Sequence, residues 1–299
     1  VLMTATDPQL MSVDEVLPEK QQPSTFALMM RNRSVFWGGV LLLIMAAIAI
    51  IWPLFTGSPT EQNVMSRLKP PSAGFWFGTD FLGRDIFVRV VHGGRISLVV
   101  GISVAAIATV IGLFTGLLAG YVRWLDAPVM RVMDGLMAIP AILLAIAMIS
   151  ISGATLTTVV IAITIPEIPR VVRLVRAVVL TVRDEPYVEA AIASGTRLPA
   201  ILIRHILPNT IAPMIVQATY ICGAAMLTES ILGFLGAGIP PEIPSWGNIM
   251  SEGRTYFQLT PWIIFFPGIA LAVTVLAVNI VGDGLRDTLD PRIARKMRV

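Results

Sequence analysis

The chain has 299 residues, of which 55% are hydrophobic and 14% are charged, and its mean hydropathy is +0.79. One soluble core cannot bury so much apolar surface, so the composition excludes a soluble globular fold and predicts an all-α membrane protein. A formal charge of +3 could suggest nucleic acid, but basic residues in a membrane protein usually report orientation. We therefore expect membrane lipid, and no nucleic acid, as a partner.

The amino-terminal part divides into a tail, a first span and a loop. Residues 1–34 are polar and partly acidic, and they lack the basic start and short apolar stretch of a signal peptide. Residues 35–55 are apolar and long enough to cross a bilayer, which needs roughly 20 residues. Residues 56–95 are too polar to span and are predicted to form an extracytoplasmic loop.

A membrane domain is predicted over residues 96–284, followed by a tail at 285–299. The second span of the chain, at 96–121, opens this domain and contains Gly112, Gly116 and Gly120. This spacing of glycines is typical of close helix contact. Pro140 interrupts the third span, and Pro166 and Pro169 are expected to kink or end the fourth. With the first span this makes six transmembrane helices, the last five at about 96–121, 129–150, 154–174, 211–235 and 261–281.

The distribution of basic residues predicts the orientation. With both termini in the cytoplasm, 16 of the 22 lysines and arginines lie inside and six lie outside. Five of those six fall in the predicted external loop at 56–95, so this loop departs from the excess of basic residues on the cytoplasmic side. The overall bias still favours cytoplasmic termini under the positive-inside rule.

Residues 169–207 are basic and amphipathic and do not span, and the segment 184–209 carries the most informative pattern. Asp184 can cap a first short helix that places Val188 and Ile192 on one face, and Gly195 is a suitable breaker. Thr196 can cap a second helix, which places Leu198, Ile201, Leu202 and Ile206 on one apolar face and Arg197 elsewhere on its surface. Such a pair is either a rigid connector moved by another protein or two interfacial helices lying on anionic lipid.

The same segment carries a specific spacing: Glu189-Ala190-Ala191, then Gly195, then Leu207-Pro208. This spacing resembles the EAA loop of ABC-importer permeases. The resemblance assigns ATPase coupling to this loop, with the residues Glu189, Ala190, Ala191, Gly195, Arg197, His205, Leu207 and Pro208.

Three further stretches narrow the resemblance: FGTDFLGRDIFVRVVHGGRISL at 77–98, ESILGFLGAGIPPEIPSWGNIM at 229–250 and NIVGDGLRDTLDPR at 279–292. They resemble motifs of the C-type permease subunits of dipeptide, oligopeptide, glutathione and nickel importers. Gly233 stands where that family often has serine. The resemblance implies the type I ABC-importer permease fold in the bacterial inner membrane. It also implies three kinds of partner: a second homologous permease, two cytoplasmic ABC ATPases and an extracytoplasmic solute-binding protein.

A few polar residues outside this loop are candidate functional residues. Glu229 lies near the outer end of the fifth span, where hydration would cost little, so Glu229 and Pro140 are candidate pathway or gate residues. Asp80, Arg84 and Asp85, with Trp246, either dock the binding protein or hold local structure. Arg170, Arg173 and Arg176 are expected to anchor a helix at the headgroups, or to take part in gating or ATPase contact, and Glu167 is placed to pair with one of them.

The energy source and the solute follow less directly from the sequence. No phosphate loop of the form GxxxxGK[ST] occurs, so the chain is not expected to be an enzyme, and ATP and Mg²⁺ would bind the partner ATPases. An ion-driven secondary transporter would need ionisable residues at mid-bilayer, whereas Asp134, Glu167 and Glu229 are predicted near span ends. Spans lined with small and apolar residues favour short peptides, and glutathione, nickel chelates or opines are the alternatives.

Overall fold

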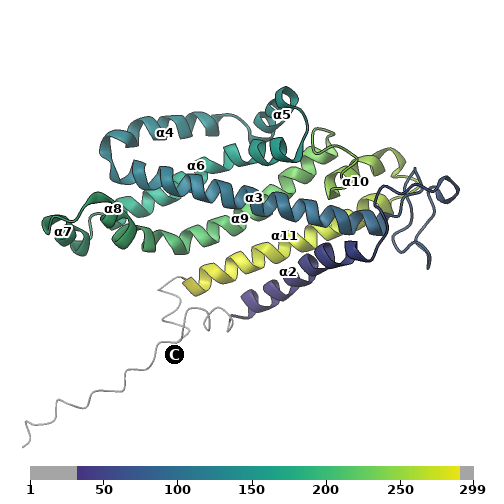
Figure 1. Cartoon of the computed structure of the whole chain (residues 1–299), viewed down its shortest axis with the longest axis horizontal. Coiled ribbons are helices and arrows are strands. Elements are labelled where there is room, and N and C mark those ends of the chain that lie inside the picture. Colours follow the sequence, from purple (N-terminus) through teal and green to yellow (C-terminus); the bar gives the residue numbers. More distant parts are fainter. Residues whose placement is uncertain (1–31, 290–299) are drawn as a thin grey trace, which may run out of the picture.

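The computed structural model describes residues 32–289, and its regular structure over that range is helical. The long helices run lengthwise beside one another, as Figure 1 shows. The predicted tails at 1–34 and 285–299 lie mostly outside the described residues. The helices are α2 (Arg33–Ile51), α3 (Ile86–Tyr121), α4 (Arg123–Ala138), α5 (Ala141–Ser152), α6 (Leu156–Val182), α7 (Pro186–Ala193), α8 (Leu198–Ile201), α9 (Leu207–Phe234), α10 (Trp246–Gly253) and α11 (Trp262–Leu289).

Within residues 32–289, four helical runs are long and apolar enough to cross a membrane: Arg33–Leu54, Ile86–Tyr121, Leu198–Phe234 and Trp262–Leu289. The bent pair α4 and α5 would make a fifth span. Helix α6 has the length of a span but carries one glutamate and three arginines between positions 167 and 176. The predicted count of six transmembrane helices is therefore approximate.

Several predicted boundaries were wrong. Helix α3 begins at Ile86, ten residues before the expected start at 96, because Asp85 caps it and the mixed residues 86–95 form its first turns. Helix α6 runs through Pro166 and Pro169 and ends at Val182, although the prolines were expected to kink or end it. Both prolines lie among packed helices, where a missing hydrogen bond is tolerated.

The predicted break at Ile139 and Pro140 is confirmed and is sharp. Helix α4 ends at Ala138, helix α5 begins at Ala141, and the two axes differ by 87°. Pro140 is the N-cap of α5, where it needs no helical N–H donor.

The centre of the bundle is the contact between α3 and α6, and it explains the glycine repeat. A Cβ on Gly116 would lie 2.7 Å from Val175 Cβ, and one on Gly120 would lie 2.7 Å from Val179 Cβ. Gly112 meets Val171 in the same way. The two helices therefore run in the same direction and approach as closely as their backbones allow.

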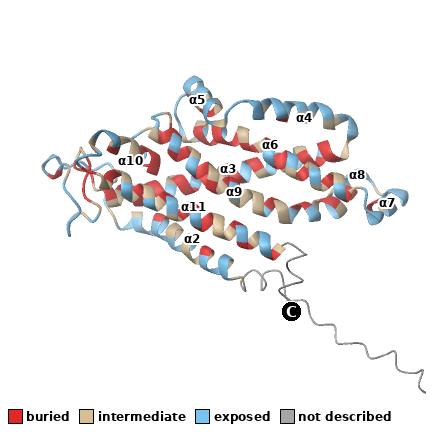
Figure 2. Cartoon of the chain, turned by 180° about the vertical axis from the view of Figure 1, so that it is seen from behind, coloured by how far each residue is buried: buried red, intermediate tan, exposed pale blue. Residues whose placement is uncertain are grey.

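The ends of the described chain lie together. Asn32 Nδ2 donates to Gly284 O over 3.1 Å, which ties the start of α2 to the end of α11. Both ends point toward the part of the bundle that carries α7, and α10 lies at the opposite end (Figures 1 and 2). The ends of the described chain and the 184–209 segment thus share one end of the bundle.

Candidate functional site

The segment 184–209 forms the predicted elbow, and Gly195 is its joint. Gly195 has φ +77°, in the left-handed region that favours glycine. The Gly195 N–H donates to Ile192 O over 2.9 Å, and the Thr196 N–H donates to Ala191 O over 3.1 Å. This pair of bonds is the Schellman motif, which ends α7 and turns the chain toward α8.

Two capping assignments were wrong. The N-cap of α7 is Glu185 instead of Asp184, with Pro186 in the first turn, and the N-cap of α8 is Arg197 instead of Thr196. The second helix is also not separate from the fifth span. Helix α8 passes through a π-helical turn, Leu202–Ile206, into α9, so Leu207 and Pro208 lie in a continuous helix.

Buried apolar residues hold this elbow to the bundle. Val188, Ile201 and Ile206 are buried, as members of the predicted apolar faces should be. Asn209 Nδ2 donates to His205 O over 2.7 Å and to Tyr187 Oη over 3.3 Å, which ties the start of α9 to α7. The elbow is therefore a fixed projection.

The outer side of the elbow is exposed and partly apolar. The remaining EAA residues and their neighbours, Glu189, Ala190, Gly195, Arg197 and Pro208, are exposed, whereas Ala191, His205 and Leu207 are half-buried. Ile192 and Leu198 belong to the predicted apolar faces, and 48% and 40% of their surfaces are accessible in the chain. Tyr187 and Ile203 are exposed as well. Exposed apolar side chains rimmed by charge are typical of a binding surface.

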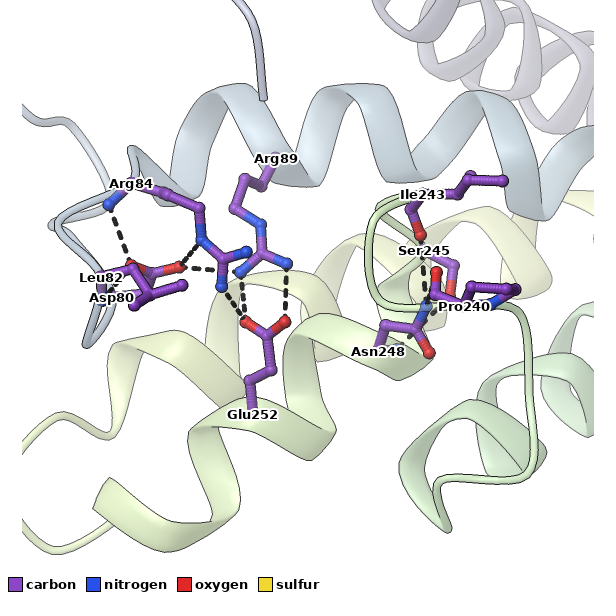
Figure 3. A network of polar contacts seen from close by, with 9 residues as sticks. All are labelled: Asp80, Leu82, Arg84, Arg89, Pro240, Ile243, Ser245, Asn248 and Glu252. Carbon is purple, nitrogen blue, oxygen red and sulfur yellow. Dashed lines mark hydrogen bonds and ion pairs between the residues drawn. The ribbon is translucent and has the colours of Figure 1, made fainter. Parts of the chain in front are cut away.

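At the other end of the bundle, four charged side chains form a closed network, drawn in Figure 3. Asp80 Oδ2 accepts from Arg84 Nε over 2.5 Å and from Arg89 Nη1 over 2.9 Å. Glu252 accepts a hydrogen bond from Arg84 Nη2 over 2.5 Å and further hydrogen bonds from both terminal nitrogens of Arg89. Two positive and two negative charges thus balance, and α10 is fixed to the start of α3.

The network gives the candidate docking residues structural positions. The predicted i, i+4 pairing of Asp80 with Arg84 is confirmed, and both residues are buried. Arg89 and Glu252 were missed, because they are distant in sequence from each other and no local spacing joins them. Trp246 is buried and donates from Nε1 to Val90 O over 2.9 Å. These buried side chains hold together the end of the bundle that lies opposite α7.

Asp85 stands apart from this network. Its Oδ1 accepts from the Phe87 N–H over 2.8 Å, which caps α3. Partial burial raises the pKa of Asp85, and the hydrogen bonds from the backbone of Phe87 and Val88 oppose that rise. The carboxylate of Asp85 therefore acts as the N-cap of α3.

Glu229 is buried, whereas the sequence led us to expect a position at the hydrated end of a span. Its side chain is fully buried where α3, α9 and α10 meet, with Gly93 against Ser245 and Gly247 against Ser230. Ser97 Oγ donates to Glu229 Oε2 over 3.0 Å. Close glycine contacts bury this region more completely than its distance from the helix end suggested.

The arginines of α6 pair with acidic residues instead of lying free at the headgroups. Arg176 makes a two-pronged contact to Asp126, at 2.5 and 2.7 Å, and Arg173 Nη2 lies 2.5 Å from Asp134 Oδ1. The expected pairing of Glu167 with an arginine is confirmed at Arg170, over 3.2 Å. These pairs form because α4 folds back alongside α6.

Comparison with known proteins identifies the family. Residues 108–295 match the model described as the binding-protein-dependent transport system inner membrane component. The chain is 51% identical over 279 residues to the probable peptide ABC transporter permease protein y4tQ of Sinorhizobium fredii, covering 93% of this chain and 96% of that protein.

Other relatives extend the comparison. The dipeptide transport system permease protein DppC of Alkalihalophilus pseudofirmus is 44% identical, with 90% of this chain and 89% of that protein covered. The glutathione transport system permease protein GsiD of Pectobacterium atrosepticum is 40% identical, with 88% and 89% covered.

A solved structure supports the fold. The MetNI methionine ABC transporter, in an inward-facing conformation, has a chain that superposes with a TM-score of 0.55 at 21% identity, covering 70% of this chain and 95% of that chain. At this identity the likeness concerns the fold alone, which is the type I importer permease fold. The sequence match over most of the chain, together with this fold, shows that the protein belongs to the family of inner-membrane components of binding-protein-dependent transport systems.

Proposed function

We propose that the chain is one of two permease subunits of an ATP-driven importer, and that it carries short peptides or peptide-like solutes across the bacterial inner membrane. One observation carries this proposal: a permease of this family exposes an ordered elbow at 184–209, anchored at Val188, Ile201 and Ile206 and apolar on its outer side. A loop fixed to the spans and open to a partner can transmit a push from that partner.

The partners we propose are two cytoplasmic ABC ATPases at this elbow, a second homologous permease and an extracytoplasmic binding protein. ATP and Mg²⁺ would bind the ATPases. The ATPases require the elbow to face the cytoplasm, which places both termini there, in agreement with the distribution of basic residues. The binding protein would then meet the opposite end of the bundle, near Asp80, Arg84, Asp85 and Trp246, where the buried ion network holds the outer surface in shape.

The solute class rests on the relatives whose names specify peptide, dipeptide or glutathione transport, and these cover nearly the whole chain. Peptides and glutathione share a free amine and a free carboxylate, so one route can serve both. Alternating access would expose that route first to the binding protein and then to the cytoplasm. Nickel chelates or opines are the alternative solutes.

Deleting the gene should abolish growth of an amino-acid auxotroph on di- to pentapeptides that contain the required residue, and should lower radiolabelled peptide uptake by about tenfold or more. The free amino acid should still support growth, which controls for general damage. Unchanged uptake of every peptide, together with lost nickel accumulation, would overturn the peptide assignment.

A further inference from the structure

The charged residues between α4 and α6 lie further from the ends of the spans, measured along the helix axes, than their sequence positions suggested. Because Gly112 packs on Val171 and Gly116 packs on Val175, the same register sets Ala108 level with Glu167. Ala108 is in the middle of the apolar run at 96–121. This register sets Glu167 opposite the middle of that run, whereas the sequence led us to expect it near a span end. Arg170 and Arg173 follow about 5 and 9 Å further along the helix.

These side chains do not face the packed centre of the bundle. Helix α6 contacts α3, α9, α5 and α4, and the valine face of α6 is covered by α3. Arg170 and Arg173 nevertheless keep 54% and 44% of their side-chain surface accessible, and Asp134 keeps 60%. Exposed charges at this depth are stable only against water or against other polar groups, because hydrocarbon would cost several kcal/mol each.

The break between α4 and α5 points to water independently. Asp134 is level with Arg173 through their ion pair, and Ile139 lies five residues further along α4, about 7 Å toward the level of Glu167. There the chain turns by 87°, and Ile139 and Pro140 are exposed. Broken helices at membrane depth occur where the freed backbone groups are buried in protein or line an aqueous cavity. Since this break is exposed in the chain, a water-filled path explains both the break and the charges.

Building on the peptide transport proposed above, we propose that Arg170 and Arg173 form a solute subsite that takes the carboxylate of a peptide in transit. Each guanidinium has five N–H donors, and the ion pairs to Glu167 and Asp134 use only part of them. The acidic partners offer acceptors for the peptide amine. Because the solute must compete with an existing ion pair, binding stays weak enough for release on the far side.

Thiol accessibility tests whether Arg170 and Arg173 face water, independently of any solute. In a Cys222→Ser background, Arg170→Cys and Arg173→Cys in the complete reconstituted importer should react with an anionic, membrane-impermeant thiosulfonate. The reaction should be at least about tenfold faster than at Ile269→Cys, an exposed position on the apolar helix α11. Reaction no faster than at the control would mean that Arg170 and Arg173 face lipid or the second permease, and would overturn the subsite.

Solute protection and uptake test the carboxylate. A dipeptide with a free carboxylate should slow the reaction at both cysteines, and its C-terminal amide should not. The double variant Arg170→Gln and Arg173→Gln should lower the maximal uptake of the free dipeptide about tenfold, as expected for losing a charge-assisted hydrogen bond. The control Arg131→Gln, an exposed arginine of α4, should not. Equal protection by acid and amide, or unchanged uptake in the double variant, would overturn the subsite.

Wild-type uptake, measured in parallel, separates the two proposals. If the wild-type importer moves no peptide, the proposed function fails. If it moves peptides and the arginine variants behave like the wild type, only the subsite fails.

Discussion

Replacing Gly195 by valine should lower ATP-driven uptake by about tenfold or more while leaving the amount of protein in the membrane unchanged. Gly195 has φ +77°, and a β-branched residue in that region costs about 1–2 kcal/mol, close to a tenfold change in the population of the native turn. A Cβ at this position meets nothing within 4 Å, so the cost lies in the backbone and not in a clash.

Gly195→Asn is the matched control, because asparagine adds a side chain of similar size but tolerates the left-handed region. It should keep most of the uptake. Co-purification of the ATPases with each variant locates the defect at the elbow. Wild-type uptake in Gly195→Val, at equal abundance, would contradict the role of the elbow as a mechanical joint.

Replacing Glu252 by glutamine should destabilise the protein more than any other single change considered. The substitution leaves Arg84 and Arg89 with Asp80 as their one remaining carboxylate in a buried site, and breaking a buried pair costs about 3–5 kcal/mol. We expect the midpoint of thermal unfolding in detergent to fall by roughly 6–12 °C, with reduced accumulation in the membrane.

The control for this variant is Glu242→Gln, an exposed glutamate in the loop before α10, which should change the midpoint by no more than about 2 °C. A double variant, Arg84→Gln with Glu252→Gln, restores the charge balance and should lose less stability than the sum of the two single changes. Strict additivity, or a Glu252→Gln midpoint within about 2 °C of the wild type, would contradict a coupled network.

The sequence predicted those features that local spacing determines. The glycine repeat of α3 predicted a close helix contact, Gly195 predicted the end of α7, and Pro140 predicted the break between α4 and α5. Each depends on residues within a few turns of one another, or on the backbone of a single residue. The elbow at 184–209 was predicted for the same reason, because the residues of its motif lie close together in the sequence.

Features that depend on distant segments were missed or misplaced. Arg89 and Glu252 meet across 163 positions, so no periodicity could join them. Glu229 was expected to be hydrated because its depth was judged along one helix, whereas α3 and α10 cover it. Glu167 was placed at a span end because α6 was expected to stop near its prolines. In each case the deciding fact was which helix packs alongside.

Peptide uptake into liposomes that contain the complete importer is the most direct test of the central claim. With its second permease, its ATPases and a peptide-loaded binding protein, the wild-type chain should accumulate radiolabelled dipeptide only when hydrolysable ATP is supplied on the side of the 184–209 elbow. Accumulation should stop with a non-hydrolysable analogue and should not respond to a proton or sodium gradient. Gradient-driven uptake without ATP would contradict the account.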